Sequence, residues 1–234
     1  MLKVGSMKIP EHLAIIMDGN RRWAKEKNIS NVTEGHRVGV DRLDEIVEEC
    51  GDLGVKFLTV YTFSTENFKR GADELKMLFD LFVDFAVNKR KKLIEKGVRV
   101  RLLGKLELFP DFVRKAMEDL LSATEGGEEL VLSLCFGYGG RQELLDACSA
   151  LMNDGVKADE LTEDKFEEYL YTKGMPDVDV MIRTGGAMRV SNFLPWQISY
   201  AEMFFVDKYW PDFSKEELYK VLEEFEERER RFGK

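Results

Sequence analysis

The sequence predicts an α/β fold with a mainly parallel central sheet covered by helices on both faces. Short β-rich runs alternate along the chain with longer stretches of helical periodicity, which is the pattern of parallel strands joined by crossover helices. The 234 residues are enough for one large core, and neither an internal repeat nor a low-complexity linker divides them. We therefore treat residues 1–234 as a single domain.

Short apolar runs give the expected strands. They lie at residues 13–17, 56–62, 98–103, 130–135, 178–182 and 203–206. Between them, apolar residues recur at the spacing of amphipathic helices, most clearly over 40–50 and 218–225. Ser214 and Glu217 form a capping-box sequence at the start of the second of these helices.

The segment 74–96 is apolar around more of its circumference than an ordinary surface helix. We expect one helix here, with two interpretations open. Either the helix is buried on two sides, or it packs on the sheet with one face and lines an apolar cavity with the other. The expected cavity wall is the helical face shared by Leu75, Phe79, Phe82 and Ala86. The basic run 89–92 is typical of a solvated helix end, and contact with anionic lipid headgroups is the less favoured alternative.

Composition excludes several classes of protein. The net charge of −9 argues against a nucleic-acid partner, because such binding surfaces are usually basic. No apolar run reaches the length of a membrane span and the N-terminus has no signal-peptide pattern, so we expect a cytoplasmic location. Cys50, Cys135 and Cys148 form no C-x-x-C pair and are expected to be buried free thiols. With His12 and His36 as the only histidines, a histidine-rich metal site is excluded.

Polar stretches directly follow four of the expected strands. "DGNRR" follows Met17, "FSTENFKR" follows Thr62, "GYGGR" follows Phe136, and "RTGGAMRVSN" follows Ile182. The carboxyl ends of parallel strands meet at one edge of a sheet, where ligands bind in the crevice. We therefore expect these stretches to build a single binding site.

The donors in these stretches suit a phosphate-bearing ligand. Arg22, Arg70, Arg183 and Arg189 offer forked donors that match phosphate oxygens. The Gly185-Gly186 pair lets backbone amides approach an anion closely. Neutral donors come from Ser64, Thr65, Ser191 and Asn192.

Carboxylates are few in the same stretches, namely Asp18, Glu66 and, further along, Glu202. This balance indicates a diphosphate site with magnesium, which binds few protein carboxylates together with substrate oxygens. The alternative is a scatter of surface arginines in salt bridges. A P-loop, a dinucleotide-binding fingerprint and a nucleophile elbow are all absent from the sequence.

Six of these segments resemble the cis-prenyltransferases, the undecaprenyl diphosphate synthase family: "HLAIIMDGNRRWAK", "EGHRVG", "YTFSTENFKR", "IRTGG", "RVSNFLPWQ" and "YAEMFFVDKYWPDF". The resemblance extends over about residues 12–213. It implies a magnesium-dependent homodimer that condenses isopentenyl diphosphate with an allylic diphosphate. It also implies a six-stranded, mostly parallel sheet and an apolar tunnel for the growing chain.

The resemblance also implies roles for individual residues. Asp18 would position magnesium and the diphosphates, Glu202 would be a second magnesium ligand, and Asn67 falls at the family's proton-acceptor position. The implied substrate-binding positions are Gly19, Asn20, Arg21, Arg22, Trp23, His36, Ser64, Thr65, Glu66, Phe68, Arg70, Arg183, Arg189, Val190 and Ser191. Among them, 19–22 match the grip on the allylic diphosphate, and Arg183, Arg189 and Ser191 match the grip on isopentenyl diphosphate.

Some positions depart from the family pattern. Ala187-Met188 stands where many bacterial members have Glu-His, a histidine that can help to hold magnesium across the dimer. A thioether is a poor ligand for a hard cation, so we do not expect Met188 to bind the metal. Gly137 replaces a usual asparagine, Gly71 a common proline, and Asn31-Val32 a frequent arginine. These departures bear on primer and metal affinity more than on reaction class.

The expected product is a short- or medium-chain cis-polyprenyl diphosphate, because 70–104 carries no obvious insertion relative to bacterial members. The apolar segment 189–206 is the expected dimer contact, with core packing as its alternative, and peripheral membrane contact would aid product release. Two other functions stay open: irregular head-to-middle coupling of short allylic diphosphates, and a non-catalytic subunit of a heteromeric prenyltransferase. The second is disfavoured because Asp18, Arg22, Glu66 and Asn67 all remain.

Overall fold

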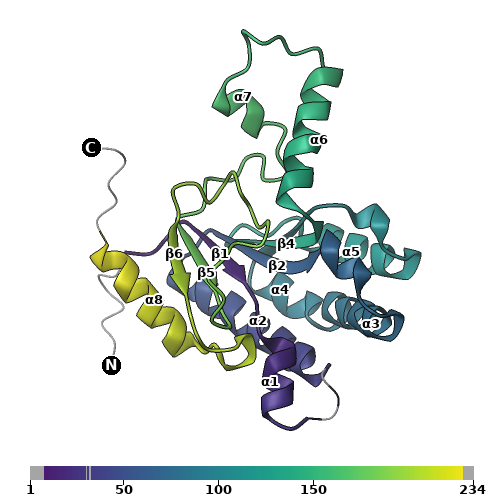
Figure 1. Cartoon of the computed structure of the whole chain (residues 1–234), viewed down its shortest axis with the longest axis vertical. Helices are drawn as coiled ribbons and strands as arrows, with labels where there is room; N and C mark the ends of the chain where they lie inside the picture. Colours follow the sequence, from purple (N-terminus) through teal and green to yellow (C-terminus); the bar gives the residue numbers. More distant parts are fainter. Residues whose placement is uncertain (1–7, 30, 32, 229–234) are drawn as a thin grey trace.

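One six-stranded sheet organises the chain in the computed structural model, which describes residues 8–29, 31 and 33–228. The strands are β1 (His12–Ile16), β2 (Phe57–Ser64), β3 (Val98–Leu103), β4 (Leu130–Tyr138), β5 (Val180–Arg183) and β6 (Glu202–Phe205). Their order is β3-β4-β2-β1-β5-β6, and every neighbouring pair is parallel (Figure 1). The expected strands are confirmed, and the mainly parallel sheet is parallel throughout.

Helices and short 3₁₀ turns connect the strands. The helices are α1 (Asn20–Glu26), α2 (Glu34–Leu53), α3 (Ala72–Asn88), α4 (Arg90–Glu95), α5 (Asp111–Thr124), α6 (Gly140–Asn153), α7 (Glu163–Glu167) and α8 (Lys215–Glu227). The 3₁₀ turns are η1 (Thr65–Lys69), η2 (Leu106–Leu108) and η3 (Trp210–Asp212). Among the described helices, none is both long and apolar enough to cross a membrane.

The two faces of the sheet are covered differently. Side chains alternate along β1, so Leu13 and Ile15 enter the larger core while Ala14 enters a smaller one. The larger core contains residues of α2, α3, α5 and α8. In the smaller core the sheet packs mainly against irregular chain, including Phe193 and Leu194. Figure 1 shows α6 and α7 projecting away from the sheet, so the expected helical cover of both faces is only partly realised.

The apolar segment 74–96 is two helices rather than one. α3 ends at Asn88, and α4 begins after Lys89. Lys89 and Lys92 lie 3.2 and 3.0 Å from the same Asp44 carboxylate oxygen on α2, and Lys92 also lies 2.9 Å from Glu48. Part of the basic run is therefore an ion-paired anchor of α4 on α2, which corrects its reading as a solvated helix end.

The cysteines divide between core and surface. Cys50 and Cys135 are buried, as expected, whereas Cys148 is exposed. Cys148 lies on the outer face of α6 with Leu145 and Met152, whose exposed fractions are 62% and 80%. The expectation of a buried thiol at Cys148 was wrong because the apolar stripe it belongs to faces away from the core.

Candidate active site

The centre of the site lies between two neighbouring strands. Ile16, the last residue of β1, pairs in register with Arg183, the last residue of β5. The strand order reverses at β1, since the chain first proceeds to β2 on one side and later enters β5 on the other. Ligands of parallel α/β sheets bind at this kind of switch point, outside the carboxyl ends of the strands. Asp18 follows β1 at this edge, as the sequence predicted.

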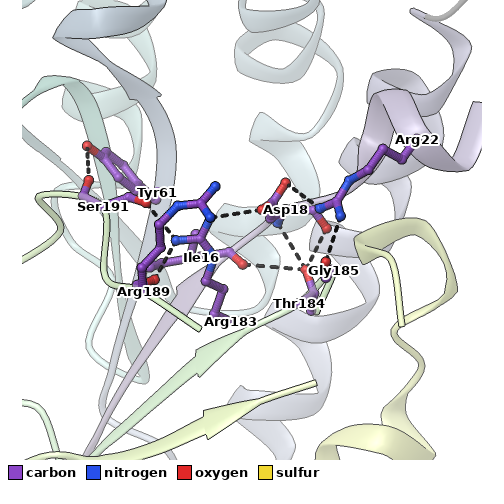
Figure 2. A network of polar contacts seen from close by, with 9 residues as sticks. All are labelled: Ile16, Asp18, Arg22, Tyr61, Arg183, Thr184, Gly185, Arg189 and Ser191. Carbon is purple, nitrogen blue, oxygen red and sulfur yellow. Dashed lines mark hydrogen bonds and ion pairs between the residues drawn. The ribbon is translucent and has the colours of Figure 1, made fainter. Parts of the chain in front are cut away.

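Two arginines hold the Asp18 carboxylate. Arg183 Nη2 donates to Asp18 Oδ2 at 2.9 Å, and Arg22 Nη2 lies 3.1 Å from Asp18 Oδ1 (Figure 2). The Thr184 hydroxyl fixes the backbone of the same residue, since it donates to the Asp18 carbonyl at 2.8 Å and accepts from the Asp18 amide at 3.0 Å. Both carboxylate oxygens are thus engaged by cationic groups.

Glycine is required where the chain passes close to these arginines. Gly185 has a φ of +82°, and a Cβ there would lie 2.5 Å from Arg22 Nη2. The Gly185 carbonyl accepts from Arg22 Nη1 at 2.8 Å (Figure 2). The "RTGG" stretch therefore fixes Arg22 through its backbone and leaves no room for a side chain.

Arg183 links the sheet to the loop that follows β5. Its side chain is only 4% exposed, and its Nη1 donates to Ser191 Oγ at 2.7 Å and to the Arg189 carbonyl. Arg183 Nε is buried without a hydrogen-bond partner in the described part of the chain. A buried guanidinium with an unused donor suits an anionic ligand.

A cavity of about 680 Å³ opens at these residues. One part of its lining is polar and charged: Asp18, Asn20, His36, Ser64, Glu66, Asn67, Arg70, Arg183, Arg189, Ser191 and Asn192. The other part is apolar: Val40, Leu43, Leu78, Leu81, Phe82, Phe85, Met117, Leu134 and Phe136. A further hollow of about 350 Å³, lined by Gly19, Arg21, Arg22 and Lys25, shares Asp18, Asn20, His36 and Arg70 with the cavity. The space is therefore amphipathic, with arginines at one part and hydrocarbon at the other.

The face of α3 that lines the cavity differs from the expected one. Of the predicted wall, only Phe82 lines the cavity; Leu75, Phe79 and Ala86 do not. The ring of Phe79 instead packs near Phe109, with centroids 5.6 Å apart. The ring centroids of Phe82 and Phe136 are 4.7 Å apart, and the Phe136 ring stacks on that of Phe109 with centroids 4.0 Å apart. Phe82 and Phe136 therefore line the apolar part, and Phe79 and Phe109 pack against them without lining it.

His36 is kept neutral at the charged part of the cavity. Burial, together with the nearby charges of Arg70 and Arg21, lowers its pKa to about 4. Its Nε2 and the neighbouring Asn20 Oδ1 are buried without partners among the described residues. Two unpartnered polar atoms beside the arginines are consistent with the substrate-binding positions that the sequence predicted.

The turn η1 places Asn67 at the cavity. Asn67 Oδ1 accepts from the Ser64 amide at 3.1 Å, and the two residues form a reciprocal capping box. Glu66 precedes it, and although burial raises the pKa of this carboxyl, hydrogen bonds from its own backbone and from Ser64, Asn192 and Thr65 lower it overall. Just after η1, Arg70 donates to Glu74 at 3.1 Å. The "STEN" stretch is thus a preformed turn over the site.

Four predicted substrate-binding residues line neither the cavity nor the hollow beside it: Trp23, Thr65, Phe68 and Val190. Thr65 Oγ1 donates to Glu66 Oε2 at 3.3 Å. Trp23 Nε1 donates to Asp212 at 2.9 Å, Val190 packs on the smaller core, and Phe68 packs against Phe63 with centroids 4.8 Å apart. Their side chains pack within the chain, and their part in substrate binding stays a prediction.

Glu202 does not join Asp18 within one chain. It pairs in register with Val180, which pairs with Leu13, so Glu202 stands level with the start of β1. Asp18 lies five residues beyond Leu13, which corresponds to roughly 15 Å along the strand. The Glu202 carboxylate pairs instead with Arg228 at 3.0 Å. Within one chain, Asp18 and Glu202 stand at opposite ends of the strands and do not share a metal ion. Glu202 as a second magnesium ligand stays a prediction.

Tyr61 and Thr184 belong to the candidate site, and sequence reasoning missed both. Tyr61 lines the cavity, stacks on Phe193 with centroids 4.8 Å apart, and donates to the Ser191 carbonyl at 3.4 Å (Figure 2). Thr184 is fully buried beneath Asp18. Their positions near the carboxyl ends of β2 and β5 were the available signal.

Comparisons with known proteins agree with this geometry. Residues 16–233 match the prenyltransferase family (undecaprenyl diphosphate synthase). An isoprenyl transferase of Clostridium perfringens is 47% identical over 97% of this chain and 90% of its own. A tritrans,polycis-undecaprenyl-diphosphate synthase (geranylgeranyl-diphosphate specific) of Pyrococcus abyssi is 45% identical over 99% of this chain and 90% of its own.

A solved structure agrees as well. The lavandulyl diphosphate synthase from Lavandula x intermedia, in complex with dimethylallyl diphosphate, superposes with a TM-score of 0.92 at 31% identity, covering 97% of this chain and 99% of that one. Sequence and structure therefore match over nearly the whole chain, including the strand ends that carry Asp18 and Arg183. The chain belongs to the undecaprenyl diphosphate synthase family of cis-prenyltransferases.

Proposed function

We propose that this prenyltransferase condenses isopentenyl diphosphate with an allylic diphosphate primer and releases a short- or medium-chain cis-polyprenyl diphosphate. The amphipathic cavity carries the proposal, because its arginines suit the diphosphate groups and its aliphatic and aromatic walls suit a growing isoprenoid chain. A volume of about 680 Å³ is that of a small-molecule site.

The arginines supply the electrostatic part of the reaction. When the carbon–oxygen bond of an allylic diphosphate breaks, negative charge develops on the leaving diphosphate, and fixed cationic donors stabilise it. Arg22 lines the hollow beside Asp18, whereas Arg183, Arg189 and Ser191 come from β5 and the following loop. We assign the first group to the primer and the second to isopentenyl diphosphate.

Asn67 is the residue we assign to proton removal after the new carbon–carbon bond forms. One acceptor site of its Oδ1 is used by the Ser64 amide, and a second remains for a substrate group. Because a carboxamide is not itself a strong base, Asn67 would orient the proton, and a diphosphate oxygen would receive it.

The donor set fits magnesium held mainly by substrate. Members of this family generally use Mg²⁺. Among residues 8–29, 31 and 33–228, no group of three or more histidine, cysteine, aspartate or glutamate side chains is placed to hold a metal ion. Asp18 is the carboxylate beside the arginines, and one carboxylate with diphosphate oxygens is a common Mg²⁺ environment. When bound, the ion would neutralise diphosphate charge, and Asp18 would hold it.

We also propose that the enzyme is a homodimer, and the contact through segment 189–206 stays a prediction, because its side chains divide between core and surface. Phe193 and Leu194 of the predicted interface segment are fully buried within the chain, so they pack in the core. Tyr200 of the same segment is 73% exposed, and exposed apolar side chains also lie on α6, at Leu145 and Met152, and at Met188 after β5. Cytoplasmic location and peripheral membrane contact for product release remain predictions.

Irregular head-to-middle coupling is the second candidate. The superposing lavandulyl diphosphate synthase, solved with dimethylallyl diphosphate, favours it, whereas relatives of 45–47% identity are named isoprenyl transferase and undecaprenyl-diphosphate synthase. A non-catalytic subunit is disfavoured because Asp18, Arg22, Glu66 and Asn67 lie together around one space.

Product analysis distinguishes these functions. Purified protein with Mg²⁺ is incubated with labelled isopentenyl diphosphate together with either dimethylallyl or geranylgeranyl diphosphate as primer. A separate reaction contains dimethylallyl diphosphate alone. We expect label in polyprenyl products that elute as a short or medium-length series. Products from dimethylallyl diphosphate alone would favour head-to-middle coupling, and no turnover with any primer would indicate a non-catalytic subunit.

A further inference from the structure

Asn192 connects the loop after β5 to the start of helix α6. Its backbone carbonyl accepts from the Gly140 amide at 2.9 Å, and its Oδ1 accepts from the Arg141 amide at 2.8 Å. The first amides of a helix have no partner within the helix, so Asn192 caps α6 from a distant part of the chain.

The same side chain reaches the turn η1. Asn192 Nδ2 donates to Glu66 Oε1 at 3.4 Å, and Glu66 directly precedes Asn67. Gly139 lies between the two loops, because a Cβ there would stand 3.0 Å from Thr65 Oγ1 and 3.2 Å from Asn192 Nδ2. The two loops therefore meet over a glycine, with the amide of Asn192 bridging them.

The backbone of this loop needs such anchoring. The backbone φ values of Ser191, Asn192 and Leu194 are +49°, +63° and +47°. They lie in the left-handed region, which residues other than glycine and asparagine rarely adopt. Ser191 Oγ accepts from Arg183 in this conformation. Strain of this kind persists where surrounding contacts fix the chain, and Asn192 makes those contacts.

We propose that Asn192 is a positioning residue that couples the loop carrying Arg189 and Ser191 to the turn carrying Glu66 and Asn67. Because the Asn192 side chain links the loop after β5 to the turn η1, ordering of that loop by isopentenyl diphosphate also orders the turn. The inference rests on the proposed function, since it assumes that this diphosphate binds at Arg183, Arg189 and Ser191.

The first test is Asn192→Gly, which keeps the left-handed backbone and removes the carboxamide. The helix keeps a second anchor, because Glu143 Oε1 accepts from the Tyr171 amide at 3.0 Å and from Gln197 Nε2 at 3.1 Å. We expect the KM for isopentenyl diphosphate to rise and kcat to fall, each at least tenfold, with the primer KM within twofold of wild type.

A matched control removes a cap elsewhere. Thr162 Oγ1 accepts from the Lys165 amide at 3.1 Å at the start of α7, outside the cavity lining. Thr162→Ala should lower the melting temperature yet leave both KM values and kcat within twofold. Kinetic losses in Thr162→Ala as large as those in Asn192→Gly would overturn the positioning role.

Hydrogen exchange measures the coupling without turnover. With isopentenyl diphosphate added to wild type, we expect slower amide exchange in both 64–70 and 189–192. In Asn192→Gly, we expect slower exchange to remain in 189–192 and to be lost in 64–70. Equal protection of 64–70 in wild type and Asn192→Gly would overturn the coupling. Failure of wild type to make product would reject the proposed function separately.

A double-mutant cycle tests the bridge to Glu66. Asn192→Asp keeps the acceptor for the Arg141 amide but places a carboxylate opposite Glu66. We expect it to lower kcat/KM at least tenfold in wild type but less than threefold in Glu66→Gln, where the introduced amide can donate to the introduced carboxylate. Equal losses in both backgrounds would show that the two residues do not interact.

Discussion

Among single residues, Asp18 is a carboxylate that contacts two arginines of the candidate site at once. It lies between Arg183, which is almost fully buried, and Arg22, which is half exposed. Arg183 keeps its bonds to Ser191 and to the Arg189 carbonyl when the carboxylate is neutralised. A change at Asp18 should therefore affect chemistry far more than folding.

We expect Asp18→Asn to reduce kcat by roughly a hundred- to a thousandfold, because removal of one preorganised electrostatic group costs about this factor. Circular dichroism and thermal unfolding should show a folded protein. Steady-state kinetics at saturating Mg²⁺ is the measurement, and a kcat near that of wild type would exclude the assigned role.

His12 sets a pH dependence of stability. Burial lowers its pKa to about 4, and its ring bonds to Thr59 Oγ1 and to the Pro176 carbonyl, both at 2.8 Å. Since the unfolded side chain has a pKa of about 6.5, the unfolded state binds a proton first as the pH falls. The free energy of unfolding should therefore decrease between pH 6.5 and 4, by about 3 kcal/mol for this residue.

Urea unfolding at several pH values checks this expectation. His36 also has a pKa of about 4 and adds to the slope, so the difference between wild type and His12→Asn isolates His12. The variant should be less stable at pH 7 and should lose less on acidification. Parallel curves for the two proteins would contradict the prediction.

Residue roles were predictable where a strand end fixed them. Asp18, Arg183 and Ser191 converge because parallel strands present their carboxyl ends at one edge. The distance of Glu202 from Asp18 within the chain was not predictable, because a short apolar run does not reveal its register, and a few residues decide which edge a side chain reaches. The cap that Asn192 places on α6 joins distant parts of the chain, and no local pattern encodes it.

Among elements, α3 shows what apolar periodicity in a sequence can and cannot predict about a helix. The existence of the helix was predictable, but its orientation was not, because apolar residues surround most of it. Packing against the sheet and α5 decides that Phe82 lines the cavity while Phe79 does not. The break at Lys89 also lacks a sequence signal such as proline.

This pair of phenylalanines gives a controlled test of product length. We expect Phe82→Ala to shift products to longer chains, because the truncated side chain opens the aromatic wall beside Phe136. Phe79→Ala removes an equal volume from the neighbouring cluster and should leave the products unchanged. Each change costs up to about 3–5 kcal/mol of stability. Chromatography of the products of wild type and both variants is the measurement. A Phe82→Ala profile identical to that of wild type would show that this wall does not limit product length.

For the whole molecule, the sequence predicted one α/β domain, and the family match over residues 16–233 agrees with a single unit. The sheet faces were predicted less well. Irregular chain covers much of the smaller core, and α6 projects with apolar side chains exposed. An amphipathic stripe reveals that a helix has an apolar face, but not whether that face packs within the same chain.

We expect light scattering at micromolar concentration to give the mass of two chains. Leu145→Glu with Met152→Glu should shift this mass toward one chain, because carboxylates replace the exposed apolar face of α6. Glu substitution at Ile94 on α4, which is 49% exposed, is the control and should leave the mass unchanged. A monomeric wild type with full activity would rule out the homodimer.

The pairing of Asp18 with two guanidinium groups implies an order of assembly. Both carboxylate oxygens are already neutralised in the resting protein, so a free cation would have to compete with Arg22 and Arg183 for them. A bound diphosphate would compete with the carboxylate for the same arginines and so free Asp18 for the cation. Cation and diphosphate are then thermodynamically linked, and each should raise the affinity of the protein for the other by the same factor. Calorimetric titration should accordingly detect weak Mg²⁺ binding to the protein alone and much tighter binding with inorganic diphosphate present. Equal Mg²⁺ affinities in the two titrations would show that the arginines do not compete with the cation for Asp18.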